Sequence, residues 1–455
     1  MPEARPVARN PDAAVFTEGS IARHVLIMSM TGAVGTMAVF FVDLADLYFL
    51  SLLGQTEVTA AVGFAQSILL FQLSVALGNG IAAGVLVSRS LGSGDTAGAR
   101  DQAANAFLFA MLSSAVIAFL IAVFADGLLT FMGASGEVKH LAKIFIWTIS
   151  PGYVLAAGSL CLAAILRSLG DPRRAMYVTL STALIILALD PILILGLGWG
   201  IQGAAVATVL AEAAAFAVGL HGVVRVHSAF GPIQWQGLWR CKAVIWAIAY
   251  PAALSQMTIP LSNAYMTYLM AGFGDGAVAG FAIVCRLVPV AYGAVFALTS
   301  AVGPVIGQNF GAGHHARVRE AITQSLSIST IYTFSMSLLL FVLAGQIATA
   351  FSAEGQSYAV VTFFCTFIGV SWAFTGAQFI ASAAFNNLGH PRLAALFSWG
   401  RVGLGTVPFA TVGAAIAGPE GVLTGNAIGA LLFGSMAVAV AYRLAAAKQA
   451  VVDHA

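Results

Sequence analysis

The stretch FFVDLADLYFLSLLG, residues Phe40–Gly54, sets two carboxylates, Asp43 and Asp46, in a predominantly apolar run. Residues three apart lie on one face of a helix, so the two acids share a face if this run is helical. An ionised Asp at the centre of a membrane-spanning helix costs roughly 2.5–3.5 kcal/mol on insertion scales, so acids in such a position mark functional sites. The alternative is that both acids lie near a helix end and are solvated by headgroup water.

The composition of the whole chain indicates a polytopic membrane protein. Of the 455 residues, 60% are hydrophobic and only 8% are charged, with a mean hydropathy of +0.92. Ordinary soluble domains carry about 25% charged residues. So few charges leave no basic surface for a nucleic-acid partner. The four cysteines form no CxxC or metal-ligand pattern, and no cleavable signal precedes the first apolar run.

Apolar stretches of about 20 residues are long enough to cross a bilayer as helices. The sequence therefore predicts an all-α membrane fold with twelve spans, separated by short loops rich in Gly, Pro and charge. The predicted spans are residues 25–50, 58–88, 103–125, 139–167, 175–198, 202–224, 244–271, 277–308, 322–343, 357–386, 393–416 and 422–443.

The distribution of charge in the loops predicts the orientation. Most Lys and Arg fall on the side of the N-terminus, whereas the opposite loops carry mainly acids. By the positive-inside rule, both termini are cytoplasmic, and the chain is a multi-pass protein of the inner (plasma) membrane.

The chain also repeats itself at a constant shift of 219 residues. The matching residues are Gly84, Gly92, Gly94 and Arg100 with Gly303, Gly311, Gly313 and Arg319, and Gly170, Pro172 and Arg173 with Gly389, Pro391 and Arg392. This shift spans six helices, so the halves are parallel repeats, an architecture that secondary transporters use. We expect a cytosolic arm (1–22), an N-lobe (23–226), a cytosolic linker (227–242), a C-lobe (243–444) and a cytosolic tail (445–455).

Four segments resemble motifs of the multidrug and toxic compound extrusion (MATE) family. They are ADLYFLSLLG (45–54), SRSLGSGDTAGAR (88–100), GQNFGAGHHARVR (307–319) and LDPILILGLGWGIQGAAVAT (189–208). The resemblance implies two six-helix lobes that open alternately to either side of the membrane. It also implies an antiporter, not an enzyme, that needs no cofactor, and we expect the chain to be a monomer. Such an antiporter exports small organic cations or amphipathic drugs and toxic organic compounds against a proton (H+) or sodium (Na+) gradient.

The resemblance places the coupling site in the N-lobe, where family members with an acidic cavity hold a polar cluster at the positions of Asp46, Asp190 and Thr208. Pro191 removes a backbone donor and leaves carbonyl oxygens free for a cation or water. Position 186 is Ile where some members have Asn, so the ligand set differs. We expect proton coupling, with sodium at Asp46 and Asp190 as the alternative.

Two further acids belong to this expected coupling site, Asp43 and Glu212. Glu212 follows Thr208 by four residues and so shares its helix face. It either extends the polar cluster or stays protonated in a hydrogen bond to a neighbouring helix. In the C-lobe, Asn263 stands opposite Asp43 and Met266 opposite Asp46, so the acids are missing there.

The sodium site of NorM-type members, a Glu in helix seven and an Asp in helix ten, is not matched, because these spans offer Gln256 and Gln378. The DinF-like branch is therefore favoured. The expected substrate cavity comprises Tyr48, Gln256, Asn263, Tyr268, Arg286 and Gln378. Arg286 and Arg401 are expected to snorkel or to meet helix carbonyls rather than an anionic substrate.

Two other functions are alternatives to drug export. A flippase for a lipid-linked precursor would need a cationic cavity for pyrophosphate, which the N-lobe acids disfavour. A membrane-embedded enzyme lacks support, because the sequence has no HExxH, GxSxG or Cys/His metal motif.

Overall fold

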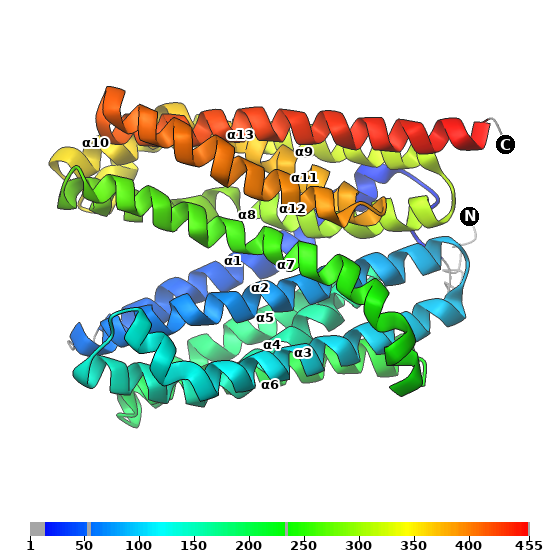
Figure 1. Cartoon of the computed structure of the whole chain (residues 1–455), viewed down its shortest axis with the longest axis horizontal. Helices are drawn as coiled ribbons and strands as arrows, with labels where there is room; N and C mark the ends of the chain where they lie inside the picture. The colour runs from blue at the N-terminus through cyan, green and yellow to red at the C-terminus, as the bar shows by residue number, and fades with distance from the viewer. Residues whose placement is uncertain (1–13, 52–55, 233–234, 454–455) are drawn as a thin grey trace, which may run out of the picture.

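The computed structural model describes residues 14–51, 56–232 and 235–453, and within these ranges the chain is all-helical (Figure 1). The α-helices are α1 (Ile21–Ser51), α2 (Thr56–Gly92), α3 (Thr96–Phe131), α4 (Gly136–Ser168), α5 (Pro172–Asp190), α6 (Gly200–Leu220), α7 (Trp235–Ala271), α8 (Asp275–Gly311), α9 (His315–Ala350), α10 (Gly355–Phe363), α11 (Trp372–Asn387), α12 (Pro391–Gly400) and α13 (Val407–Asp453). Five short π or 3-10 turns continue α5, α6, α10 and α12: η1 (Pro191–Gly196), η2 (His221–Val226), η3 (Phe364–Ile368) with η4 (Gly369–Ser371), and η5 (Arg401–Thr406).

Among the described residues, eleven helical stretches are long and apolar enough to cross a membrane. The last of them, Pro391–Ala447, has 57 residues and is interrupted at Ala417 and Gly418, whose backbone is not helical. This stretch covers two of the predicted spans, so the total of twelve stays a prediction. Helix α7 begins at Trp235, inside the segment 227–242 that the sequence predicts as a linker.

Short-range signals set several helix ends. Asp95 caps α3 by accepting a hydrogen bond from the Gly98 backbone N–H at 2.8 Å. Gly94, just after α2, and Gly313, just after α8, have φ of +78° and +76°, a left-handed conformation that glycine adopts without strain. These two glycines are a pair under the 219-residue shift.

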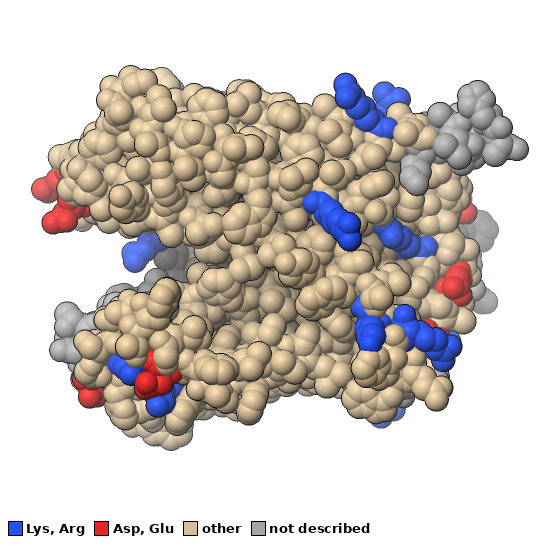
Figure 2. All heavy atoms as spheres, viewed as in Figure 1, with Lys and Arg blue, Asp and Glu red and all other residues tan. Residues whose placement is uncertain are grey.

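The helices form two groups, which lie one above the other in Figure 1. Helices α2 to α6 pack mainly on one another, as do α8 to α13, whereas α7 runs between α2 and α12 and α1 packs on both α5 and α8. The groups meet where α1 and α2 pack against α8. The first described residues and the end of α13 lie at the same end of the molecule, and Lys and Arg gather mainly toward this end (Figures 1 and 2). We call it the basic end.

At the basic end, α2 and α8 cross in close contact. A Cβ atom added to Gly92 would lie 2.7 Å from the carbonyl carbon of Gln308, and one added to Gly311 would lie 3.0 Å from that of Arg89. The 219-residue shift exchanges these two contacts. We call this crossing, defined by Arg89, Gly92, Gln308 and Gly311, the basic-end seal.

Hydrogen bonds across the two helix groups hold the seal. The Arg89 guanidinium donates to the backbone oxygen of Asn387 at 3.0 Å, and the Gln308 amide donates to that of Ser168 at 2.8 Å. The 219-residue shift maps Arg89 onto Gln308 and Ser168 onto Asn387, so the two hydrogen bonds are equivalent in the two halves of the chain. The backbone N–H of Phe16 donates to Gln308 at 2.8 Å, so the segment before α1 lies against the seal.

Candidate functional site

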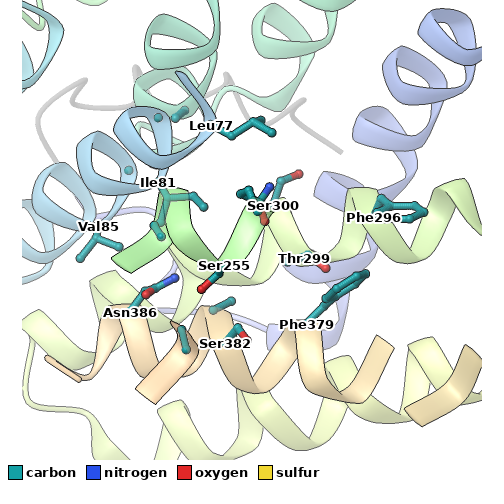
Figure 3. A pocket seen from close by; sticks show the side chains of 18 of the residues that line it. Leu77, Ile81, Val85, Ser255, Phe296, Thr299, Ser300, Phe379, Ser382 and Asn386 are labelled. Carbon is teal, nitrogen blue, oxygen red and sulfur yellow. The ribbon is translucent and has the colours of Figure 1, made fainter. Parts of the chain in front are cut away.

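A cavity of about 370 Å³ lies between the two helix groups. Its walls come from α2, α4, α7, α8, α11, α12 and η5, with Phe40 from α1. In Figure 3, Leu77, Ile81 and Val85 of α2 form one side, and Ser382 and Asn386 of α11 face them. We call this space the central cavity. Its lining is mainly apolar, with a few amide and hydroxyl groups, as in sites that bind organic molecules.

Buried amides supply polar contacts to the central cavity. Gln378 is only 2% exposed and Asn386 only 5%. Their side-chain carbonyl oxygens have no hydrogen-bond partner among the described residues. Such acceptors suit N–H or O–H donors of a bound molecule or water, because an unpaired buried polar atom is costly.

The charges of the central cavity are positive. Arg167, in the last turn of α4, and Arg401, the first residue of η5, both line it and are half-buried. Every other described lining residue is uncharged. The Arg401 guanidinium lies 3.4 Å from the hydroxyl of Thr375.

A second, smaller cavity of about 150 Å³ extends into the helices α7 to α13. It shares Phe296, Phe379 and Arg401 with the central cavity, so Arg401 faces both spaces. Its described lining contains no other charged residue.

The predicted coupling acids lie outside both cavities where the structure describes them. Asp190 is 1% exposed and ends α5, and the chain turns into the π-helical η1 at Pro191. Helix α1 packs along α5 and also contacts η1, so the helix that carries Asp46 runs beside Asp190. The side chains of Asp43, Asp46 and Tyr48 lie outside the described part of the chain.

The other two predicted coupling residues lie on α6. Thr208 donates its hydroxyl to the backbone oxygen of Ala204 at 3.0 Å. Glu212 is half-buried, and its carboxylate is in hydrogen-bonding contact with Ser159 of α4. Neither of them lines a described cavity, and the described residues contain no group of three His, Cys, Asp or Glu side chains that could hold a metal ion.

The predicted substrate residues divide among three places. Gln256 and Gln378 line the central cavity, and Asn263 lines the smaller one. Tyr268, which is 73% exposed, and Arg286, which is also exposed, line neither.

Arg167 was not among the predicted site residues. A positive residue at the end of a span looks like an ordinary cytosolic loop cation in the sequence. Leu160 and Ala164 line the same cavity, seven and three residues earlier on the same helix. This helical spacing is the one sequence signal that links Arg167 to an inward face.

The whole chain is similar to known membrane transporters. The model of the MatE family matches residues 33–192 and again 251–412. An FAD transporter of Shewanella oneidensis is 30% identical over 433 residues, which are 93% of this chain and 95% of that protein. A probable multidrug resistance protein of Bacillus subtilis, YpnP, is 28% identical over 378 residues, 81% of this chain and 84% of its own. A crystal structure of the Vibrio cholerae MATE transporter VcmN superposes with a TM-score of 0.89, at 25% identity, covering 93% of this chain and 96% of that one.

Proposed function

Since the chain belongs to the MATE family of membrane transporters and is not an enzyme, we propose that it is a secondary active exporter of drugs and other amphipathic organic compounds. The observation that carries this proposal is the central cavity between the two helix groups, with its apolar wall and buried amides. The cavity lies behind the basic-end seal, and Figure 2 shows a hollow between the groups at the opposite end. Such a shape suits alternating access, in which one end opens as the other closes.

We further propose that the chain is a monomer in the inner (plasma) membrane with twelve spans and both termini in the cytoplasm. The lobes are residues 23–226 and 243–444, related by the 219-residue repeat. Two observations support the repeat: the family model matches once in each half, and the contacts of the seal exchange under the shift. With this orientation, the basic end faces the cytoplasm.

We propose that protons drive export through the acids of residues 23–226, as in a DinF-like member. Asp190 is deeply buried beside α1 at a π-helical turn, a feature frequent at functional sites. Two carboxylates at one buried site do not both ionise cheaply, so Asp190 and Asp46 would exchange a proton between them. The alternative is sodium, held by the same two carboxylates.

The test is dye efflux from proteoliposomes under an imposed pH gradient or an imposed sodium gradient. We expect the pH gradient alone to drive efflux, and Asp46→Asn and Asp190→Asn to abolish it. Asp275→Asn is the matched control, because Asp275 is exposed at the start of α8. Efflux driven only by sodium would refute proton coupling. No dye movement under either gradient would refute drug export and favour the lipid flippase.

FAD is a second candidate substrate, because a relative that aligns over almost the full length is an FAD transporter. Gradient-driven movement of FAD across the same proteoliposomes, lost in Asp190→Asn, would support it. Retention of FAD under conditions in which a dye moves would exclude it.

A further inference from the structure

We infer that the central cavity takes organic anions, aromatic compounds that carry a carboxylate or phosphate group, in preference to organic cations. This inference rests on the proposed function, because it assigns a substrate class to the same cavity. Arg167 and Arg401 reach it from different helix groups, α4 and η5, and all its other described lining residues are uncharged.

The position of Arg401 makes a counter-charge necessary. It lies ten residues after Pro391, where the span Pro391–Ala447 begins, and so at membrane depth. An unpaired guanidinium at that depth is expensive. Its described hydrogen bond is to the neutral hydroxyl of Thr375, and at 3.4 Å this bond is long.

Arg167 adds a second positive charge to the same space. Its guanidinium makes no hydrogen bond or ion pair with any residue that the structure describes. None of the acids that the structure describes in the first helix group, Asp190 and Glu212 included, lines either cavity, so none of them stands opposite the two guanidinium groups. A cationic ligand would meet two like charges there, whereas an anionic ligand would gain charge-assisted hydrogen bonds.

The wall beside Arg401 suits an aromatic ligand. Phe296 and Phe379 line both cavities together with Arg401, and their ring centroids are 5.6 Å apart. Phe40 of α1 packs on Phe296 at 6.3 Å. Figure 3 shows Phe296 and Phe379 at one end of the cavity. A ring that packs on these phenylalanines would place an attached anionic group near Arg401, and guanidinium groups bind carboxylate and phosphate through paired N–H donors.

The experiment compares two dyes with the same tricyclic xanthene ring and opposite charge, anionic carboxyfluorescein and cationic rhodamine 6G. Binding to the purified full-length protein is measured by fluorescence anisotropy. We expect the anionic dye to bind at least about tenfold tighter, which is the worth of one charge-assisted hydrogen bond. Arg401→Gln should weaken binding of the anionic dye at least about tenfold and leave that of the cationic dye unchanged or improved.

Two further variants distinguish the loss of the positive charge at position 401 from a general disturbance of the fold. Arg401→Lys keeps the charge and should retain most of the preference for the anion. Arg392→Gln is the matched control, since Arg392 lies in α12, which precedes η5 on the same span, and its side chain is exposed. Tighter binding of the cationic dye by the native protein, or an equal loss of both dyes in Arg401→Gln, would overturn the inference.

Transport of the same dyes tests the proposed function separately. Gradient-driven efflux of rhodamine 6G without anion preference would overturn the inference and leave the exporter standing. Arginine-dependent binding of carboxyfluorescein without gradient-driven movement of either dye would support the assignment of the cavity and refute the exporter.

Discussion

The basic-end seal depends on the absence of a side chain at Gly92. A Cβ atom added there would lie 2.7 Å from the carbonyl carbon of Gln308, whereas ordinary carbon–carbon contacts are about 3.5–4.0 Å. Gly92→Ala therefore requires α2 and α8 to separate by about 1 Å. Overpacking of this kind costs about 1–3 kcal/mol. Under the proposed alternating access, the contact exists only while the basic end is closed, so this cost would shift the balance between closed and open forms by about 5–150-fold toward the open form.

The distance between the first turns of α3 and α9 reports this change. Ala97 and Ala316 are both exposed and are related by the 219-residue shift, so a spin label at each would face outward from equivalent positions. In a background without reactive cysteines, double electron–electron resonance should show one short distance in the native protein. In Gly92→Ala we expect a second, longer distance with a larger population. Gly311→Ala should act in the same way, because Gly311 makes the equivalent contact with Arg89.

Gly127→Ala is the matched control, because a Cβ atom at Gly127 would meet open space. It should leave the distance distribution unchanged. If Gly92→Ala folds, as judged by its elution on size exclusion, and yet keeps the native distribution, the seal does not depend on the close crossing and this reasoning is refuted.

Three other predictions concern acids. Burial opposes the ionisation of Asp171, but hydrogen bonds from His227 and Arg174 outweigh it and lower the pKa of Asp171 to about 2. This interaction therefore stabilises the fold above about pH 4 and is lost as the pH falls from there toward 2. Asp171→Asn should lower the midpoint of thermal unfolding at pH 7, which corresponds to a loss of about 1–2 kcal/mol in the free energy of unfolding. At pH 3 the difference between this variant and the native protein should be smaller. Equal midpoints at pH 7 would contradict the prediction. Asp190→Asn should reduce gradient-driven efflux at least about tenfold, whereas the affinity for the dye should change less than about threefold, because Asp190 lines neither cavity. A parallel loss of dye affinity would place this acid in the substrate site. Glu212→Gln distinguishes the two interpretations of Glu212. If Glu212 belongs to the coupling cluster, the substitution should alter the pH profile of efflux; if Glu212 stays protonated in a hydrogen bond to a neighbouring helix, the pH profile should not change.

Most of the helices follow from the length of the apolar runs alone. The predicted span 139–167 is α4, Gly136–Ser168, because a bilayer sets a minimum length that the sequence displays directly. The predicted span 322–343 is shorter than α9, His315–Ala350, because a helix continues through polar residues beyond the apolar run. Helix α7 likewise extends through polar residues, so it begins at Trp235, before the apolar run. There Lys242 packs over the ring of Trp239 at 3.4 Å, so a segment that looks like a polar linker is helical.

The residues of the cavity were harder to predict, because a sequence does not show which helix faces meet. Gln256 and Gln378 line the central cavity as expected, since polar amides within a span favour an inward face. Tyr268 is exposed instead, although its spacing matches Tyr48 in the other half. Arg167 and Arg401 lie 234 positions apart in the chain, and only the packing of α4 and η5 around one space brings both to the same cavity.

The separation of the buried acids from the cavity constrains how coupling could work. If a proton and a substrate competed directly for one carboxylate, that carboxylate would have to line the cavity, and Asp190 does not. Helix α1 lies between Asp190 and the cavity. A Cβ atom on Gly35 would lie 3.3 Å from that of Thr179 on α5, and one on Gly32 would lie 3.4 Å from that of Ala297 on α8.

Helix α1 is thus closely packed on both sides, and its Phe40 lines the cavity. A shift of α1 against α5 on protonation would therefore also disturb α8, because neither glycine leaves room for even a methyl group against its neighbouring helix without crowding. The proposed coupling therefore runs through α1, from Asp190 at one face to Phe40 and Phe296 at the other. On this route, Phe40→Ala should leave a protonation-driven movement of α1 intact and weaken its effect on the cavity wall. Efflux would then fall while the pH dependence of the α1 position, measured by a spin label on its exposed Met30, persists.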